Sequence, residues 1–178
     1  MHSRRGAGVF VALKPADYQI ERRVRFHQNL LASGQMPSRS IHRLETRTAA
    51  LPEADALALL SGAAVHVMEG VSLADSIPMA AFLPVFTADR LPQLLERLAE
   101  VTSVTEAMAA AGISDHTRAS TRLTAIAATP ILSLKLRLTE GAPVLRTVAI
   151  SVDADGLPVE HGTTWFAGDK VTITAAPD

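Results

Sequence analysis

The fold is indicated most clearly by two short stretches, Gly62-Ala63-Ala64-Val65 and Ala74-Asp75-Ser76-Ile77-Pro78-Met79, because near copies of both recur downstream. The copies are Gly141-Ala142-Pro143-Val144 and Ala154-Asp155-Gly156-Leu157-Pro158-Val159, at offsets of 79 and 80 residues. Preserved order and spacing indicate an internal repeat. Each copy predicts two strands joined by a tight turn, because Asp-Ser and Asp-Gly favour hairpin turns and a proline suits the start of the next strand.

The residues before each hairpin also correspond. In the first copy, residues 41–47 predict a strand and residues 52–61 a helix, with Pro52 in its first turn and Gly62 at its exit. In the second copy, residues 116–127 predict a strand and residues 130–137 a short helix. The body of the chain is therefore predicted to be strand-helix-strand-strand, twice. Chance similarity between two hairpins is the alternative, because short turn motifs recur widely.

Two helices are predicted between the copies. The leucines at 91, 94, 95 and 98 form one apolar stripe at helical spacing, so we expect a helix that starts near Leu91. The second helix opens with Ser103-Val104-Thr105-Glu106, which is a capping box, and ends at Gly112.

Composition indicates a globular protein with one domain. The 178 residues are 48% hydrophobic, 20% charged and 4% aromatic, which is ample for a core. The sequence has no run of about 18 apolar residues, which excludes a transmembrane helix, and the segment Met1–Arg5 lacks the apolar region of a secretory signal. The absence of cysteine excludes disulfide scaffolds, thiol catalysis and thiolate zinc sites, and is compatible with the cytoplasm.

The net charge of −1 conceals an asymmetry. Residues 1–50 carry nine basic and three acidic side chains, a net +6, whereas the remainder carries eight basic and fifteen acidic ones, a net −7. The basic end could face a polyanion, or could be an ordinary solvated segment. Residues 1–13 predict a short strand after a glycine turn. Residues 14–40 predict a linker with one helical turn around 23–31, and the body starts near Ile41.

The sequence offers little for catalysis, and we expect no metal and no cofactor. The six histidines are scattered, and none has the spacing that puts two ligands on one helix face. Phosphate-binding glycine loops, nucleophile elbows and calcium loops are absent from the sequence.

The strand over residues 116–127 is more informative. Alternation places His116, Arg118, Ser120, Arg122 and Thr124 on one face, which is fully polar and carries two guanidinium groups. Arginine suits phosphate, phosphonate or carboxylate. The alternative is a solvated sheet face.

Two further residues could contact a ligand. Glu160, just after the second hairpin turn, could accept a hydrogen bond from a ligand hydroxyl or amine, or pair with an arginine across strands. Ser103 opens a helix whose free amides could hold an anion, although a plain helix cap is the simpler interpretation.

Several of these segments resemble a known family. Ser3–Val11 looks like the last strand of the winged-helix domain of GntR-type repressors, and residues 35–173 resemble the effector-binding (UTRA) domain of the HutC branch. The stretches that carry the second resemblance are Ala74–Ala80, Ser103–Gly112, Gly141–Arg146 and Pro158–Lys170. Arg23–Leu30 and Arg118–Arg122 look most like the phosphonate-metabolism regulators (PhnF) within that branch.

The resemblance implies an α+β fold with a chorismate lyase-like, six-stranded antiparallel sheet and flanking helices, in which the repeated hairpins form the two halves. It implies that residues 1–13 are a remnant of the wing, residues 14–40 a linker and residues 41–178 the effector-binding domain. It also places the turn at 37–40, Ser103 and the strand at 118–122 around one cleft. The effector-binding residues expected on this basis are Ser38, Arg39, Ser103, Arg118, Arg122, Glu160 and Phe166.

One departure affects the expected ligand. Many sugar-phosphate-sensing relatives carry Arg-x-Arg on the strand before the first hairpin, and the aligned positions here are Gly70 and Ser72. A sugar phosphate bound in the usual way is therefore not expected. The family's aromatic residue near the end of the cleft is Phe166 here, without a phenolic hydroxyl.

The resemblance implies the ligand-sensing domain of a cytoplasmic transcriptional repressor that binds a small anionic metabolite. Operator DNA would be read through an N-terminal winged helix that is mostly absent from this chain. We expect a homodimer, with the strand near Val171 and Ile173 most available for the interface. A chorismate lyase-like enzyme that uses the same cleft, and a dimerisation module with a vestigial cleft, are the alternatives.

Overall fold

The computed structural model describes residues 15–20, 31, 34–101 and 103–175. Residues 1–13, which resemble a wing, and most of the turn expected around 23–31 lie outside this part of the chain. The described helices and strands are β1 (Ala16–Gln19), β2 (Pro37–Thr48), α2 (Leu51–Ala56), β3 (Ala64–Ala74), β4 (Ile77–Thr87), α3 (Leu94–Glu100), α4 (Val104–Ala110), β5 (His116–Ala127), α5 (Pro130–Leu136), β6 (Pro143–Asp153), β7 (Pro158–Ala167) and β8 (Val171–Thr174).

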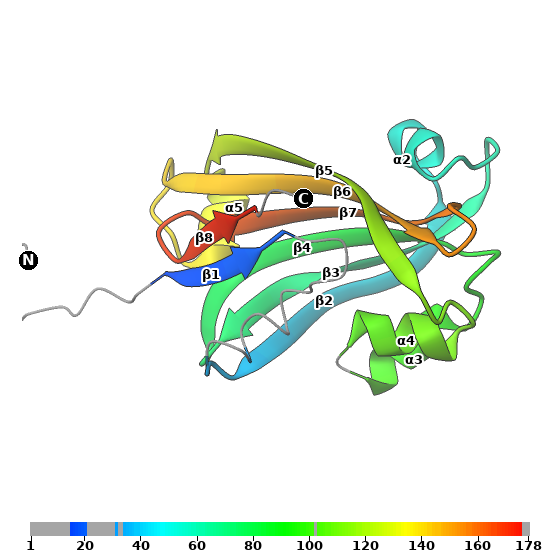
Figure 1. Cartoon of the computed structure of the whole chain (residues 1–178). Coiled ribbons are helices and arrows are strands. Elements are labelled where there is room, and N and C mark those ends of the chain that lie inside the picture. Colours follow the sequence, from blue (N-terminus) through cyan, green and yellow to red (C-terminus); the bar gives the residue numbers. More distant parts are fainter. Residues whose placement is uncertain (1–14, 21–30, 32–33, 102, 176–178) are drawn as a thin grey trace, which may run out of the picture.

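The main sheet has six antiparallel strands in the order β2-β3-β4-β7-β6-β5 (Figure 1). Each half repeats one pattern, β2-α2-β3-β4 and then β5-α5-β6-β7, and the two halves meet where β4 pairs with β7. The predicted α+β fold, with its two strand-helix-strand-strand halves, is confirmed.

The two hairpins follow from their turn residues. Asp75 and Ser76 join β3 to β4 with φ angles of 49° and 67°, the left-handed pair that a two-residue hairpin turn requires. In the second hairpin the Asp153 carboxylate accepts hydrogen bonds from the amides of Asp155, at 3.0 Å, and Leu157, at 2.8 Å. Both turns are thus encoded locally, which is why the repeat in sequence appears as a repeat in structure.

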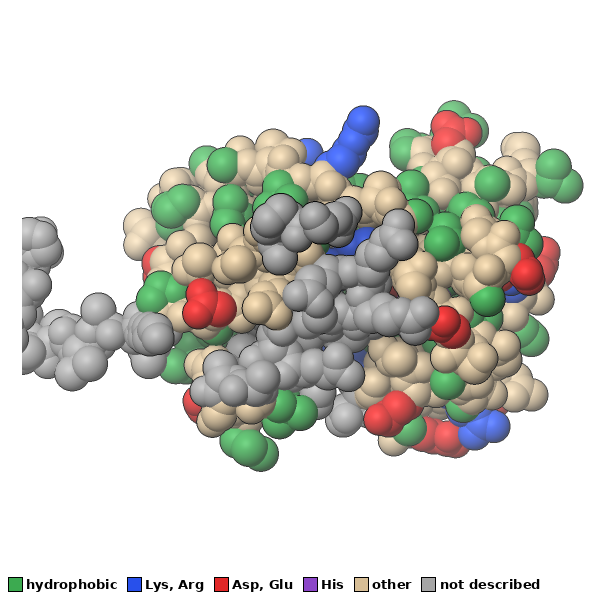
Figure 2. Space-filling model, viewed as in Figure 1, with side chains coloured by type: hydrophobic (Ala, Val, Ile, Leu, Met, Phe, Trp, Pro, Cys, Tyr) green, Lys and Arg blue, Asp and Glu red, His purple; other side chains and the backbone are tan. Residues whose placement is uncertain are grey.

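Helices cover both faces of the sheet. On one face Met68, Phe82 and Phe86 pack against the buried leucines of α3 and against Met108 of α4. On the opposite face, side chains that alternate with these pack against α5 and the end of α2. The short parallel pair of β1 and β8 covers the remainder of the first face through Tyr18, Phe166 and Val171. Figure 2 shows that acidic, basic and apolar side chains are interspersed on the surface of the described residues.

Several predicted boundaries are wrong. Strand β2 begins at Pro37, four residues before Ile41, so the expected turn at 37–40 is part of a strand. Helix α2 ends at Ala56 because Ala58 adopts a left-handed φ of 52°. Helix α3 begins at Leu94, since Leu91 is held in a preceding turn by a hydrogen bond from its amide to the Ala88 carbonyl.

The segment expected to be a linker contains a strand of the domain. Residues Ala16–Gln19 pair with Val171–Thr174, and Ala16 and Tyr18 are buried. Val171 is consequently 2% exposed, and Ile173 packs into the same cluster. The prediction that this strand offers free apolar residues for a dimer interface is therefore wrong. Within the described residues, no helix is long and apolar enough to cross a membrane.

Candidate functional site

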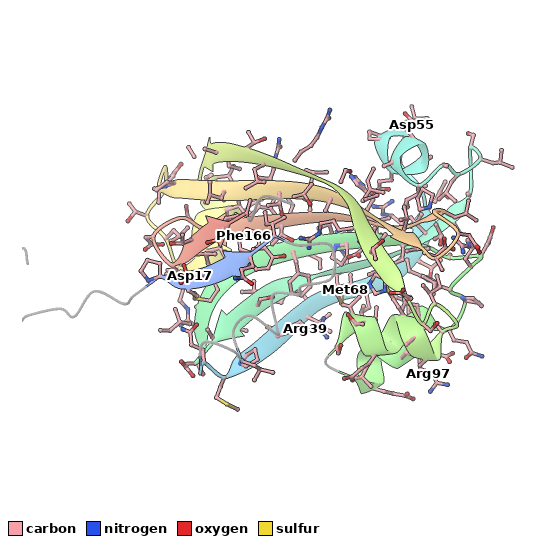
Figure 3. All side chains as sticks on the ribbon, viewed as in Figure 1. Asp17, Arg39, Asp55, Met68, Arg97 and Phe166 are labelled. Atoms are coloured by element: carbon pink, nitrogen blue, oxygen red, sulfur yellow. The ribbon has the colours of Figure 1, made fainter. Side chains whose placement is uncertain are left out.

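A cavity of about 420 Å³ lies between the sheet, β1 and the start of α4. It brings together six of the seven residues expected to bind a ligand, from β2, β5, β7 and the residue before α4. These residues are Ser38, Arg39, Ser103, Arg118, Glu160 and Phe166. Figure 3 shows Arg39, Met68 and Phe166, three residues of its lining, on separate strands of the sheet.

Arg39 is a cation of the cavity that forms no ion pair with any of the described residues. It stands on β2 opposite Ser72 of β3, in a ladder that continues through Ala80 to Phe166. Its Nε and Nη2 atoms are buried, and neither has a hydrogen-bond partner among the described residues. Burial lowers the pKa of this guanidinium group below its usual value. A buried donor pair without an acceptor is costly in the empty protein and would be satisfied by an anion.

Arg118 is anchored to β1. Its Nη2 atom donates a hydrogen bond to the Tyr18 hydroxyl at 3.1 Å, while its Nε atom is buried without a hydrogen-bond partner in the described structure. The Tyr18 ring lies against Phe166, with centroids 5.0 Å apart and ring planes inclined by 33°. Residues from β1, β5 and β7, far apart in sequence, thus form one wall of the cavity.

Glu160 and Ser103 hold defined positions in the lining. The Glu160 carboxylate accepts a hydrogen bond from the Ser151 hydroxyl at 3.0 Å. Ser103 accepts one from the Glu106 amide at 3.3 Å, as the predicted cap requires. The Ser103 hydroxyl therefore caps helix α4, and this role also fixes its position at the cavity.

Arg122 does not line this cavity. A β-bulge between Arg118 and Ser120 inserts Ala119 into β5 without a partner on β6, so the alternation of side chains is reversed beyond it. Arg122 consequently lies on the opposite face, in a shallow groove with Arg146 and Val148. The prediction that Arg118 and Arg122 share one face is wrong for this reason.

Sequence reasoning missed two aromatic residues of the site. Tyr18 lies in the segment assigned to a linker, and only the short alternation Ala16-Asp17-Tyr18-Gln19 could have indicated a strand there. Phe82, on β4, lines the cavity opposite Thr164 of β7. Across the described residues, no group of three histidine, aspartate or glutamate side chains could hold a metal ion.

The sequence and the fold both have known relatives. Residues 32–172 match the model of the UTRA domain. This chain belongs to the UTRA domain family. A curated relative, an uncharacterized HTH-type transcriptional regulator from Rhizobium meliloti (strain 1021), is 32% identical over 176 residues, which cover 94% of this chain and 69% of the relative. The protein is thus the UTRA ligand-binding domain of a GntR-family transcriptional regulator, and its relatives are regulators.

Solved structures share the fold of this UTRA domain. PhnF from Mycobacterium smegmatis superimposes with a TM-score of 0.85 at 20% identity, covering 99% of this chain and 77% of that one. A GntR-family regulator from Enterococcus faecalis V583 gives a TM-score of 0.68 at 20% identity, covering 79% of this chain and all of that one. At this identity the likeness concerns the fold.

Proposed function

We propose that the cavity of this UTRA domain binds the effector of the regulator, and that the effector is a small metabolite with an anionic group. Arg39 supports the proposal most directly, because two of its buried nitrogen atoms have no acceptor among the described residues. Arg118 contributes a second guanidinium group to the same cavity from β5, the edge strand at the other end of the sheet. Phosphonate-related metabolites belong to this class of ligand, in keeping with the resemblance to PhnF.

Tyr18 would link the cavity to the N-terminal part of the chain. Its hydroxyl is bound to Arg118 and its ring to Phe166, and it stands on β1, ahead of the six-stranded sheet in sequence. An anion that draws the Arg118 guanidinium group toward itself would change the contact that holds β1. Occupancy of the cavity would then shift the population of arrangements of the segment that leads toward the DNA-binding part.

The regulator would act in the cytoplasm as a homodimer of the HutC branch, because a GntR-type operator is two-fold symmetric and each copy would read one half-site. The cavity would bind its ligand without converting it. Turnover of chorismate by the purified chain would contradict this part of the proposal.

The matched arginines of β5 provide the test. Small carboxylates, phosphates and phosphonates are screened by thermal shift, where a ligand at 100 times its dissociation constant adds about 2.7 kcal/mol of stability. The strongest hit is then titrated into Arg118→Ala and Arg122→Ala. We expect Arg118→Ala to lose roughly 10- to 150-fold in affinity, as for one charge-assisted contact. Arg122→Ala, on the other face, should bind like the parent. Equal affinity of both variants and the parent would refute the assignment.

A further inference from the structure

The side chains of β3 and β4, which form the floor of the cavity, differ in charge from those of the outer strands β2 and β5, which form its walls. The two arginines come from β2 and β5, the outer strands of the sheet. The central strands β3 and β4 contribute no charged side chain to the lining within the described residues. Their contribution is Met68, Ser72, Ala80, Phe82 and Pro84. A ligand held by the arginines therefore has mainly apolar side chains of β3 and β4 on one side, and Glu160 and Thr164 of the neighbouring strand β7 on the other.

Phe82 is held in this floor by a glycine. Gly70 stands opposite Phe82 in the β3–β4 ladder, and a Cβ atom built on Gly70 would lie 2.7 Å from Phe82 Cζ. The same Cβ would lie 2.3 Å from the backbone oxygen of Ser40 on β2. Both contacts are closer than packed atoms allow, so any side chain at position 70 would displace the ring or the neighbouring strand. The Phe82 ring therefore occupies the space that a side chain at position 70 of β3 would need.

The lining of the cavity contains two further aromatic rings besides Phe82. Phe166 and Tyr18 line the same cavity and pack on each other, and Phe166 pairs across the ladder with Ala80, two residues from Phe82 on β4. An apolar or flat ligand body would be buried against these rings. A body covered with hydroxyl groups could bind Glu160, Ser72 and Thr164, but its hydroxyls beside Phe82, Met68 and Pro84 would lack hydrogen-bond partners, which is unfavourable.

We infer that the ligand joins one anionic group to an apolar, preferably aromatic body, as in an aryl carboxylate or aryl phosphonate, and that Phe82 sets this specificity. The inference rests on the proposed function, since the anionic group is placed at the arginines. It adds that the body of the ligand is read by the floor of the cavity. A hydroxylated phosphate ester is disfavoured by the same floor.

The test compares ligands that share a phosphate or phosphonate group and differ in the rest of the molecule. Calorimetric titrations of the chain use inorganic phosphate, methylphosphonate, phenylphosphonate and glucose 6-phosphate. We expect phenylphosphonate to bind about 10- to 100-fold more tightly than methylphosphonate, because the phenyl ring buries additional apolar surface. Glucose 6-phosphate, which is larger and hydroxylated, should bind more weakly than phenylphosphonate. In Phe82→Leu, the preference for phenyl over methyl should fall at least about fivefold.

The outcomes separate the two levels of the proposal. Binding of phenylphosphonate that is weakened by Arg118→Ala, but is no tighter than that of methylphosphonate or glucose 6-phosphate, would overturn the inference and leave the proposed function standing. Binding of no probe, or binding indifferent to Arg118→Ala, would overturn the proposed function and the inference with it. If Phe82→Leu does not fold, the ratio of affinities in the parent decides alone.

Discussion

Replacing Arg39 by methionine should stabilise the empty protein and weaken its ligand binding. The Nε and Nη2 atoms of Arg39 are buried without acceptors among the described residues, and burial lowers the pKa of the group. Methionine keeps an unbranched apolar stem and removes the unsatisfied donors. The substitution therefore removes the cost of the unsatisfied donors from the ligand-free protein. It also removes a favourable contact with the anion from the complex.

The magnitude follows from the two unpaired nitrogen atoms. An unsatisfied buried donor costs about 1–3 kcal/mol. Arg39 is only partly buried as a whole, so we take the lower part of that range for the pair, about 1–2 kcal/mol. For a chain of 178 residues, with roughly 2–4 °C of Tm for each kcal/mol, the ligand-free Tm should rise by about 2–8 °C. Affinity for the anion should fall by roughly 10- to 150-fold.

Differential scanning calorimetry without ligand and isothermal titration with the best anion from the screen measure the two effects. Arg122→Met is the control, because Arg122 is exposed on the far face and should change neither quantity. A fall in the ligand-free Tm of Arg39→Met would show that the guanidinium group already makes a stabilising contact in the empty protein. The assignment of Arg39 to the anion would then be refuted.

Four other predictions concern parts of the molecule beyond Arg39. Tyr18→Phe removes the hydroxyl that Arg118 binds, so hydrogen exchange of β1 should be faster in the free protein; unchanged exchange would contradict the proposed link. Burial lowers the pKa of His66, whose ring contacts Thr46 and the Leu91 carbonyl. Its neutral form is therefore favoured in the folded state, and stability in urea should decrease as the pH falls below about 6.5, the unfolded value, while His66→Gln should show a weaker dependence between pH 7.5 and 5.5. Light scattering at tens of micromolar protein should give the mass of a dimer, and a monomer would count against the proposed assembly. The chain should bind operator DNA only weakly and lose that binding with added salt, so sequence-selective nanomolar binding at physiological salt would contradict the expected wing remnant.

The elements that could be predicted from the sequence are those with local determinants. Strand β5 and helix α5 occur at the predicted positions, because Pro130 starts the helix, Arg137 ends it in a left-handed conformation and the strand before it is an uninterrupted stretch of twelve residues. The first hairpin turn depends on two residues, Asp75 and Ser76, and the second on the four residues between β6 and β7. Local chemistry of this kind, repeated at a constant offset, was sufficient to predict the six-stranded sheet with the help of the family resemblance.

The features that were mispredicted depend on contacts between distant parts of the chain. The bulge at Ala119 has no glycine or proline to mark it, yet one inserted residue moves Arg122 to the other face of the sheet. Strand β1 has four residues and no turn signal, and it becomes a strand only because β8 provides a partner about 150 residues later. Tyr18 was missed as a site residue for this reason.

The way the cavity is assembled gives a physical basis for sensing. Arg39 comes from the first half of the repeat, Arg118 from the second half and Tyr18 from outside both. An anion between the two arginines would therefore connect the two outer strands of the sheet, which otherwise share no ladder. It would do so next to a strand, β1, that is held by four residue pairs with β8 and by the contacts of Tyr18. Because β1 pairs only with β8 in the described sheets, a change in the Arg118 contact acts on a strand that is held by that pairing and by the burial of Ala16 and Tyr18. We expect ligand binding to act on the N-terminal connection of the domain through this contact.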